Sequence, residues 1–285
     1  MASQKYRKLL ENIKLNFRSL FSKQVVVRVT SSFLMAVPVI VFTLVGGVCF
    51  TVFVGLLAGI MSWEVTRTVC KPKNYIIEIG IGFVVVFLTL VFGLFFMSSF
   101  SETNIPLFSS LLIIVVFIIR KVHSVARVAL GNLIVVFSCF CMIWLRSTFE
   151  VELFAWILLS VVATDIGAFF FGSIIGGIKL APNISPNKTW AGLLGGIFSS
   201  LTVAWIFYLL WLETNNFSLF IMAIVIAIIS QVGDLVESAY KRSYKIKDSS
   251  KLIPGHGGVL DRLDGHMAAG IFMTFILLYY DEALI

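Results

Sequence analysis

Residues 31–63 contain no charged side chain, and this stretch restricts the possible folds more than any other feature of the sequence. A single helix over it would be about 50 Å long, against roughly 30 Å of hydrocarbon in a bilayer. Two helices separated at Gly46-Gly47 fit better. Further apolar runs lie at 75–97, 106–119, 128–145, 153–175, 190–212, 217–236 and 267–280. The pattern predicts an all-α, polytopic integral membrane protein with about nine transmembrane helices.

The composition supports the same class of protein. Hydrophobic residues make up 59% of the chain and charged residues 13%, whereas soluble domains carry about a quarter charged residues. The apolar residues form long runs and not narrow stripes, which indicates helices surrounded by lipid. The four cysteines show no C-x-x-C spacing, so neither a disulfide framework nor a zinc site is indicated.

The N-terminal segment, residues 1–30, is basic and amphipathic. Apolar residues from Tyr6 to Phe21 recur at three- and four-residue steps, with Lys and Arg on the other face. We expect a helix that lies on the membrane surface. A cleavable signal peptide would have a short apolar region, which is unlike the long apolar stretch that follows here.

The basic residues follow a strict order along the chain. Every Lys and Arg except Arg146 falls in the N-terminal segment or in every second loop, and acids occupy the intervening loops. Loops that remain in the cytoplasm accumulate positive charge. The net charge of +7 therefore indicates orientation and not nucleic-acid binding: we expect a cytoplasmic N-terminus and a C-terminus across the membrane.

The segment from Gly233 to Gly265 concentrates the polar chemistry. On a helix, Asp234, Glu237 and Lys241 would share one face at the end of the eighth span. Acids at a membrane boundary are costly and mark functional sites by default. The alternative for Glu237 is a structural ion pair with Lys241, four residues further along.

A turn and a second pair of acids follow in the same segment. The turn 253–258 contains a proline and three glycines, so it cannot be helical, and its amides are able to approach phosphate closely. By itself such a turn is as easily a plain connector. Asp261 and Asp264 then stand at i and i+3, in position to hold a hard divalent cation while Arg262 faces phosphate.

These residues resemble the signature segment of the phosphatidate cytidylyltransferase (CDP-diacylglycerol synthase) family. The similarity runs from Ser238 through Lys241-Arg242 and Lys247-Asp248 to Pro254-Gly-His-Gly-Gly and Asp261-Arg262-Leu263-Asp264. A weaker similarity covers Ser185-Pro186-Asn187-Lys188-Thr189. The chain departs from the family pattern at Ala191, Tyr240 and Gly265.

The resemblance implies transfer of CMP from CTP to phosphatidic acid, with Mg²⁺ as cofactor, in phospholipid biosynthesis. The implied catalytic residues are Lys241, Asp261, Arg262 and Asp234. The implied substrate-binding residues are Lys188, Arg242, His256, Gly257, Gly258, Ser185 and Thr189. The implied metal ligands are Asp234, Asp261 and Asp264. His256 is equally compatible with a structural role in the turn.

The same resemblance suggests a domain plan, a location and partners. Residues 1–30 form the cytoplasmic surface segment, 31–150 the N-terminal helices, and 151–285 the catalytic region with its cytoplasmic loop 241–266. We expect a homodimer in a bacterial inner membrane that binds CTP, phosphatidic acid and membrane lipid, and no nucleic acid.

Three other functions are alternatives to this one. The first is a related enzyme that uses CTP on another lipid; an isoprenoid alcohol kinase and an archaeal ether-lipid cytidylyltransferase are examples. The intact Asp261-Arg262-Leu263-Asp264 motif favours phosphatidate as the substrate. A secondary transporter should place acids near the midplane in both halves of a repeat. A lipid-binding scaffold would show no turnover of labelled CTP.

Overall fold

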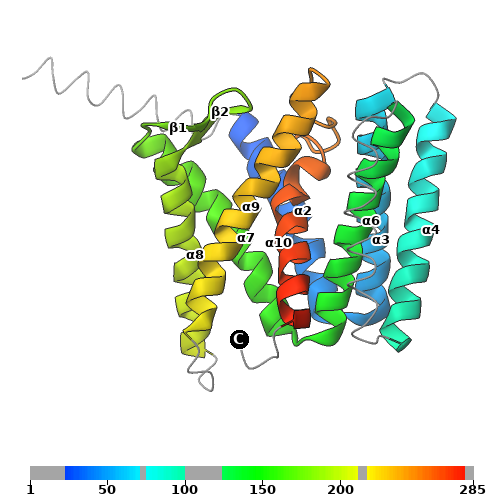
Figure 1. Ribbon diagram of the computed structural model, residues 1–285, viewed down its shortest axis with the longest axis horizontal. Helices are drawn as coiled ribbons and strands as arrows, with labels where there is room; N and C mark the ends of the chain where they lie inside the picture. The colour runs from blue at the N-terminus through cyan, green and yellow to red at the C-terminus, as the bar shows by residue number, and fades with distance from the viewer. Residues whose placement is uncertain (1–22, 71–74, 100–123, 211–216, 280–285) are drawn as a thin grey trace, which may run out of the picture.

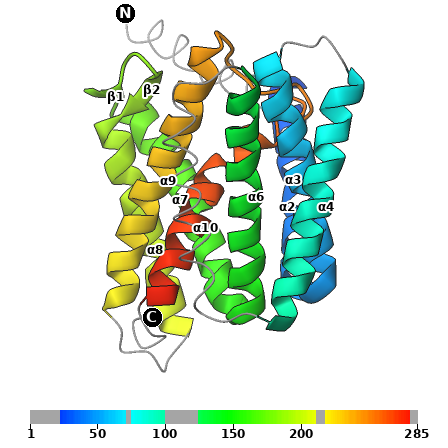
Figure 2. The same ribbon diagram turned by 45° about the vertical axis from the view of Figure 1, so that its right-hand side comes forward.

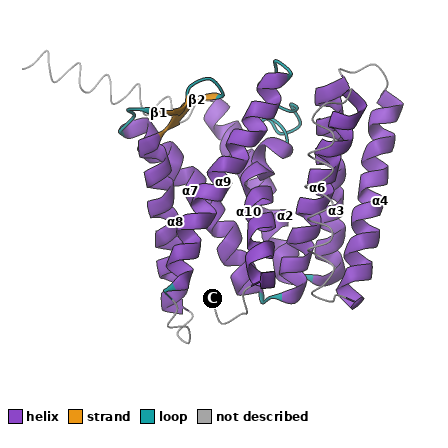
Figure 3. Cartoon of the chain, in the orientation of Figure 1, coloured by secondary structure: helices purple, strands orange, loops and turns teal. Residues whose placement is uncertain are grey.

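The computed structural model describes residues 23–70, 75–99, 124–210 and 217–279, and these form a bundle of helices with one short hairpin (Figures 1 and 3). The helices are α2 (Lys23–Val45), α3 (Gly47–Cys70), α4 (Tyr75–Ser99), α6 (Ser124–Thr148), α7 (Val151–Ile174), α8 (Trp190–Leu210), α9 (Ser218–Ser243) and α10 (Leu260–Tyr279). The all-helical class predicted from the apolar runs is confirmed for this part of the chain.

Five of the described helices are long and apolar enough to cross a membrane. They span Gly47–Val69, Arg127–Thr148, Val151–Ile174, Trp190–Leu210 and Ser218–Ser243. Eight of the predicted runs fall on described helices. The run at 106–119 and the surface helix expected before residue 22 lie outside the described residues, so the count of nine spans stays a prediction.

The predicted break at Gly46-Gly47 is confirmed. Helix α2 ends at Val45 and α3 begins at Gly47, and both glycines have positive φ, +65° and +55°. Arg146 from α6 closes this corner: its Nε donates to the Thr43 carbonyl at 2.7 Å. The positive φ of Gly46 favours glycine, and a Cβ there would also lie 2.8 Å from Nη2 of Arg146.

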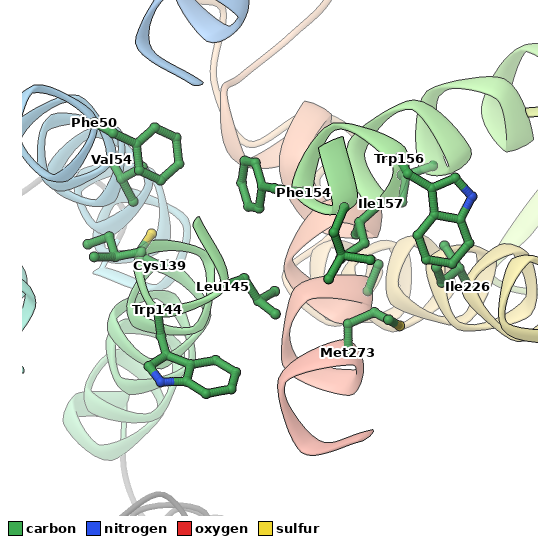
Figure 4. Packing of buried hydrophobic residues seen from close by; sticks show 14 of the residues in the cluster. Phe50, Val54, Cys139, Trp144, Leu145, Phe154, Trp156, Ile157, Ile226 and Met273 are labelled. Carbon is green, nitrogen blue, oxygen red and sulfur yellow. The ribbon is translucent and has the colours of Figure 1, made fainter. Parts of the chain in front are cut away.

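Apolar side chains from seven of the described helices, α3, α4 and α6 to α10, meet in the core of the bundle, part of which is shown in Figure 4. Phe50 of α3 packs edge-on against Phe154 of α7, with ring centroids 5.4 Å apart. Trp156 is fully buried, as are Ile226 of α9 and Met273 of α10. Many Leu, Ile and Phe side chains remain exposed on the outer faces, as expected of helices whose solvent is lipid.

Helices α7 and α8 approach each other closely through small residues. A Cβ on Gly167 would lie 2.6 Å from the Gly195 carbonyl oxygen, and one on Gly192 would lie 2.8 Å from the Ala168 carbonyl oxygen. The sequence left open whether the glycines of α8 pack within or between protomers. In the structure they pack against α7 of the same chain.

The connection between α7 and α8 is a hairpin that the sequence analysis did not foresee. Strands β1 (Lys179–Ala181) and β2 (Ser185–Thr189) pair antiparallel, with Lys179 opposite Thr189 and Ala181 opposite Ser185. Such a short, polar pair has no apolar alternation to reveal it, so its pairing depends on the helices that hold its ends. The hairpin lies at the same end of the bundle as the loop between α9 and α10 (Figure 1).

Candidate active site

The C-terminal end of α9 and the N-terminal end of α10 meet beside the hairpin, and this end of the bundle carries the charged residues singled out above (Figure 2). Helix α9 runs to Ser243, so Lys241 and Arg242 lie in its last turn. Helix α10 begins at Leu260, which places Asp261 in its first turn. The loop predicted at 241–266 is therefore shorter in the structure: residues 244–259 lie between the helices, and the two ends of the predicted segment belong to α9 and α10.

Lys241 connects the two helices. Its ammonium group forms an ion pair with Glu237, one turn earlier on α9, and donates to Oδ1 of Asp261 at 2.8 Å. The side chains of Lys241 and Asp261 are only 10% and 4% exposed. The ion pair foreseen between Glu237 and Lys241 is therefore present, but it is one half of a bridge between α9 and α10.

Three carboxylates gather next to this bridge. One oxygen each from Asp234, Glu237 and Asp264 lies within 4.8 Å of the others. Burial raises the pKa of Asp264 to about 7, and the negative charge of Asp234 adds to the effect. Oxygen donors crowded in this way fit a divalent cation, which would relieve their mutual repulsion. The residues present therefore match a metal site.

Asp261 makes different contacts. Besides the bond from Lys241, its carboxylate accepts hydrogen bonds from the Ser249 amide at 3.0 Å and the Gly258 amide at 2.8 Å. Burial alone would raise the pKa of Asp261, but these donors outweigh it and hold the pKa below its ordinary value. The structure thus brings predicted ligands Asp234 and Asp264 together with Glu237, and it places Asp261 between Lys241 and the loop.

The glycines of the turn fit closely around these acids. Gly257 has φ +88°, and a Cβ there would lie 2.7 Å from Oδ2 of Asp261. A Cβ on Gly258 would overlap the Ser249 hydroxyl and lie 2.8 Å from Cδ of Glu64. Glycine is needed at both positions because the carboxylates approach the backbone of the turn.

His256 fastens the turn to α2. Its Nδ1 lies 2.8 Å from the Ser31 hydroxyl, and its Nε2 lies 3.3 Å from the Ser32 hydroxyl. The Ser31 hydroxyl also lies 3.1 Å from the Pro254 carbonyl oxygen. No pattern in the sequence pairs this histidine with serines more than two hundred residues away.

The hairpin supplies a second lysine. Nζ of Lys188 lies 2.7 Å from Oδ2 of Asp234 and donates to the Gln231 carbonyl at 3.2 Å. The Gln231 side chain in turn donates to Asp165 of α7 at 3.2 Å. Lys188, which belongs to the weaker upstream similarity, and Asp165 are therefore both linked to α9.

The other upstream residues have local roles in the structure. The Thr189 hydroxyl accepts a hydrogen bond from the Gly192 amide at 3.0 Å and so caps the start of α8. Ser185 stands opposite Ala181 in the hairpin. Neither residue has a described contact with the three carboxylates, so their predicted contact with substrate remains a prediction.

Two arginines remain exposed at this end. Arg242 donates from Nε to the Ile184 carbonyl at 3.3 Å and from Nη1 to the Ile246 carbonyl at 3.0 Å. Arg262 donates from Nε to the His256 carbonyl at 3.1 Å. Each guanidinium is steadied by backbone oxygens and carries a permanent positive charge toward the outside of the site.

Glu64 is not among the site residues predicted from the sequence. This residue of α3 is fully buried, and its carboxylate accepts hydrogen bonds from the loop between α9 and α10. Its one signal in the sequence was its place directly after the uncharged stretch 31–63. No local pattern connects it to a loop nearly two hundred residues away.

Fold and site together define a helical membrane protein with a buried cluster of acids and lysines at one end of its bundle. The sequence model of the Cytidylyltransferase family matches residues 26–280. The phosphatidate cytidylyltransferase of Bacillus subtilis (strain 168) is 32% identical over 88% of this chain and 96% of its own length. The chain therefore belongs to the cytidylyltransferase family.

Shorter and more similar alignments are found with two other bacterial proteins. The phosphatidate cytidylyltransferase of Brucella melitensis is 46% identical over 39% of this chain and 41% of its own length. That of Haemophilus influenzae is 42% identical over 45% of this chain and 46% of its own length. These alignments thus cover less than half of each relative.

Proposed function

We propose that this protein is a phosphatidate cytidylyltransferase, which transfers CMP from CTP to phosphatidic acid and releases CDP-diacylglycerol and pyrophosphate. The proposal rests above all on one observation: the acids Asp234, Glu237 and Asp264 cluster beside Lys188 and Lys241 at one end of a membrane bundle. Family membership and the names of the relatives support the same reaction.

The charge of the substrates explains why such a site is needed. A phosphate monoester with a charge near −1.5 to −2 has to approach a triphosphate. Even two unit charges 4 Å apart repel by about 4 kcal/mol at an effective dielectric of 20. Because the attacking phosphate oxygen is already ionised, no general base is required. Catalysis consists mainly of alignment and neutralisation of charge.

The acids and cations divide this task. We propose Asp234 and Asp264 as ligands of Mg²⁺, with Glu237 close enough to join them. Bound Mg²⁺ would supply positive charge to the phosphate oxygens. Asp261, also predicted as a ligand from the sequence, is better suited by its contacts to orient Lys241 and the loop.

The cationic side chains bind the phosphates in this proposal. Lys188 and Lys241 each pair with an acid of the cluster, Asp234 and Glu237, and place positive charge where a phosphate would bind. Arg242 and Arg262 lie further out and would hold the triphosphate and the lipid phosphate. His256, Gly257, Gly258, Ser185 and Thr189 are the remaining residues predicted to bind substrate. The amides of the two glycines already donate within the protein, Gly257 to the Ile253 carbonyl and Gly258 to Asp261, so the contribution of these glycines is to let the turn pass close to the acids.

The location follows from the charge pattern and from the relatives. We propose an inner-membrane protein with its site on the cytoplasmic side, where CTP is present, and a homodimer as its assembly. The side chains of Trp205, Leu209 and Leu210 on α8 are exposed in the single chain and leave an apolar face for lipid or for a second copy.

The test is incorporation of label. Purified protein in detergent is incubated with phosphatidic acid, Mg²⁺ and CTP labelled at the α-phosphate. We expect label in the chloroform-soluble fraction, and no label when phosphatidic acid is omitted or Mg²⁺ is chelated. Restoring Mg²⁺ should restore the transfer. If the protein folds and binds CTP but never labels lipid, the proposal is refuted. A lipid-binding scaffold would then be the better description.

A further inference from the structure

Glu64 is a fully buried carboxylate that the proposed chemistry does not use. It lies on α3, in the N-terminal half of the chain, near the end of the span Gly47–Val69. A buried acid is costly unless its oxygens are satisfied by donors. Its position therefore requires partners that compensate for the loss of water.

The partners all come from the loop between α9 and α10 and from the start of α10. Oε1 accepts hydrogen bonds from the Ser250 hydroxyl at 2.6 Å and the Val259 amide at 3.0 Å. Oε2 accepts one from the Leu260 amide at 2.7 Å. Three donors thus converge on one side chain from a distant part of the sequence.

Two of these donors are the first amides of a helix. The Val259 carbonyl accepts hydrogen bonds from the amides of Arg262 and Leu263, so Val259 is the residue from which α10 starts. Amides at a helix N-terminus have no partner within the helix and favour a negative charge beside them. Glu64 supplies the acceptors for these two amides from another helix.

The loop is held between two carboxylates. Ser249 and Gly258 donate their amides to Asp261, whereas the next residue in each case, Ser250 and Val259, donates to Glu64. Asp261 in turn holds Lys241, and Asp264 of the acidic cluster lies one turn further along α10. A shift of the loop away from Glu64 would therefore move both Asp261 and Asp264.

We propose that Glu64 is a positioning residue: from the N-terminal half it fixes the loop and the first turn of α10, and thereby the geometry of Lys241 and the acidic cluster. This role rests on the proposed function of that cluster. The side chain does not contact substrate. It acts through the amides that it binds, as the outer partners of metal ligands commonly do.

The main variant is Glu64→Gln, which keeps the size of the side chain. An amide group offers one acceptor oxygen, and its NH₂ would face at least one donor of the loop. The matched control is Ser62→Ala on the same helix. This change removes a buried 2.6 Å hydrogen bond to Asn132 of α6 and leaves the contacts of the loop unchanged.

The purified full-length protein is compared in two measurements. The first is the Mg²⁺ concentration that gives half of the maximal rise in thermal unfolding midpoint, which needs no turnover. The second is kcat for CMP transfer at a temperature well below each midpoint. For Glu64→Gln we expect the Mg²⁺ concentration to rise and kcat to fall, each by about tenfold or more. Ser62→Ala should stay within about twofold of the wild type in both.

A folded Glu64→Gln protein with wild-type Mg²⁺ dependence and kcat would overturn the proposal, as would equal effects in Ser62→Ala. If Glu64→Gln does not fold, Ser250→Ala decides, since it removes one donor and keeps the carboxylate. It should shift both quantities by about two- to fivefold, on the low side of the effect expected for an outer-shell partner; no shift would refute the role. If the wild type transfers no CMP, the proposed enzymatic function is refuted. The Mg²⁺ dependence of the unfolding midpoint would still test the positioning role of Glu64.

Discussion

Lys241 shares one ammonium group between Glu237 on its own helix and Asp261 on the next. A buried lysine in this position is fixed in place, because both acids need its charge. Removing one member of a buried ion pair typically costs about 3–5 kcal/mol, since the partner is left uncompensated. Lys241 therefore has two roles that a mutation has to separate: it keeps the two helix ends together, and it is the proposed partner of a substrate phosphate.

Lys241→Met should reduce kcat by at least about a hundredfold, whereas Lys241→Arg should keep a measurable fraction. The arginine preserves the positive charge and changes only its geometry. CMP transfer is measured at saturating CTP, and the thermal unfolding midpoint of each variant serves as the control for folding. Equal loss in two well-folded variants would mean that shape, and not charge, is what the site requires at this position.

The two acids of α10, Asp261 and Asp264, have different proposed roles, and substitutions should distinguish them. Asp264→Asn removes a charge from the cluster of carboxylates, so we expect the half-maximal Mg²⁺ concentration to rise by about tenfold or more. Asp261→Asn should abolish most activity by freeing Lys241 and the loop, with a smaller change in that concentration. Titration of the unfolding midpoint with Mg²⁺ measures this concentration, and CMP transfer measures the activity. If Asp261→Asn raises the half-maximal Mg²⁺ concentration as strongly as Asp264→Asn, Asp261 is a direct ligand after all.

At the scale of the elements, the spacing of α7 and α8 decides where the hairpin lies. The two helices are joined by the hairpin, and β2 carries Lys188 to Asp234. The glycines at their contact allow the two backbones to approach more closely than they could if a larger residue lay between them. Packing inside the bundle thus determines the place of a residue in the site.

Gly167→Ala should destabilise the protein by about 1–3 kcal/mol, because the added methyl group overlaps Ser199 and the Gly195 carbonyl of α8. The matched control is Gly80→Ala on α4, where a Cβ would have no neighbour within 4 Å. Thermal unfolding in detergent compares the two with the wild type. A Gly167→Ala protein as stable as the Gly80→Ala protein would show that the close contact of α7 and α8 is not required.

At the scale of the whole molecule, the charged residues of the proposed site and Arg146 lie at opposite ends of the bundle. The hairpin and the loop before α10 lie at one end, and the last turn of α6, which carries Arg146, lies at the other (Figure 1). At the second end Arg146 binds the Thr43 carbonyl in the last turn of α2, where a positive charge is favourable. A structural contact thus explains the one basic residue that departs from the charge pattern.

A single cysteine tests the orientation. Glu150→Cys, in the exposed connection between α6 and α7, should react with an impermeant thiol reagent added to intact cells. Lys251→Cys, exposed in the loop before α10, should react only after the membrane is opened. The unmodified chain, with its own cysteines, gives the background. Labelling of Lys251→Cys from outside would reverse the proposed topology and separate the site from cytoplasmic CTP.

The sequence by itself determined the class of the protein and most of the polar residues from which the proposed site is built. Apolar runs predict helices because a backbone in lipid has to satisfy its own hydrogen bonds. The glycine pair at 46–47 and the face formed by Asp234, Glu237 and Lys241 follow from local geometry, and the structure bears out both. The signature segment from Ser238 to Asp264 was enough to indicate the family.

Tertiary structure alone decided which of these groups meet. Glu64 and Ser31 contact the loop before α10 although no pattern in the sequence links them to it. Glu237 joins Asp234 and Asp264, and Asp261 faces Lys241, because the crossing of α9 and α10 sets which carboxylates point together. Spacing along a chain specifies neighbours on one helix, whereas contacts between helices depend on how their surfaces pack.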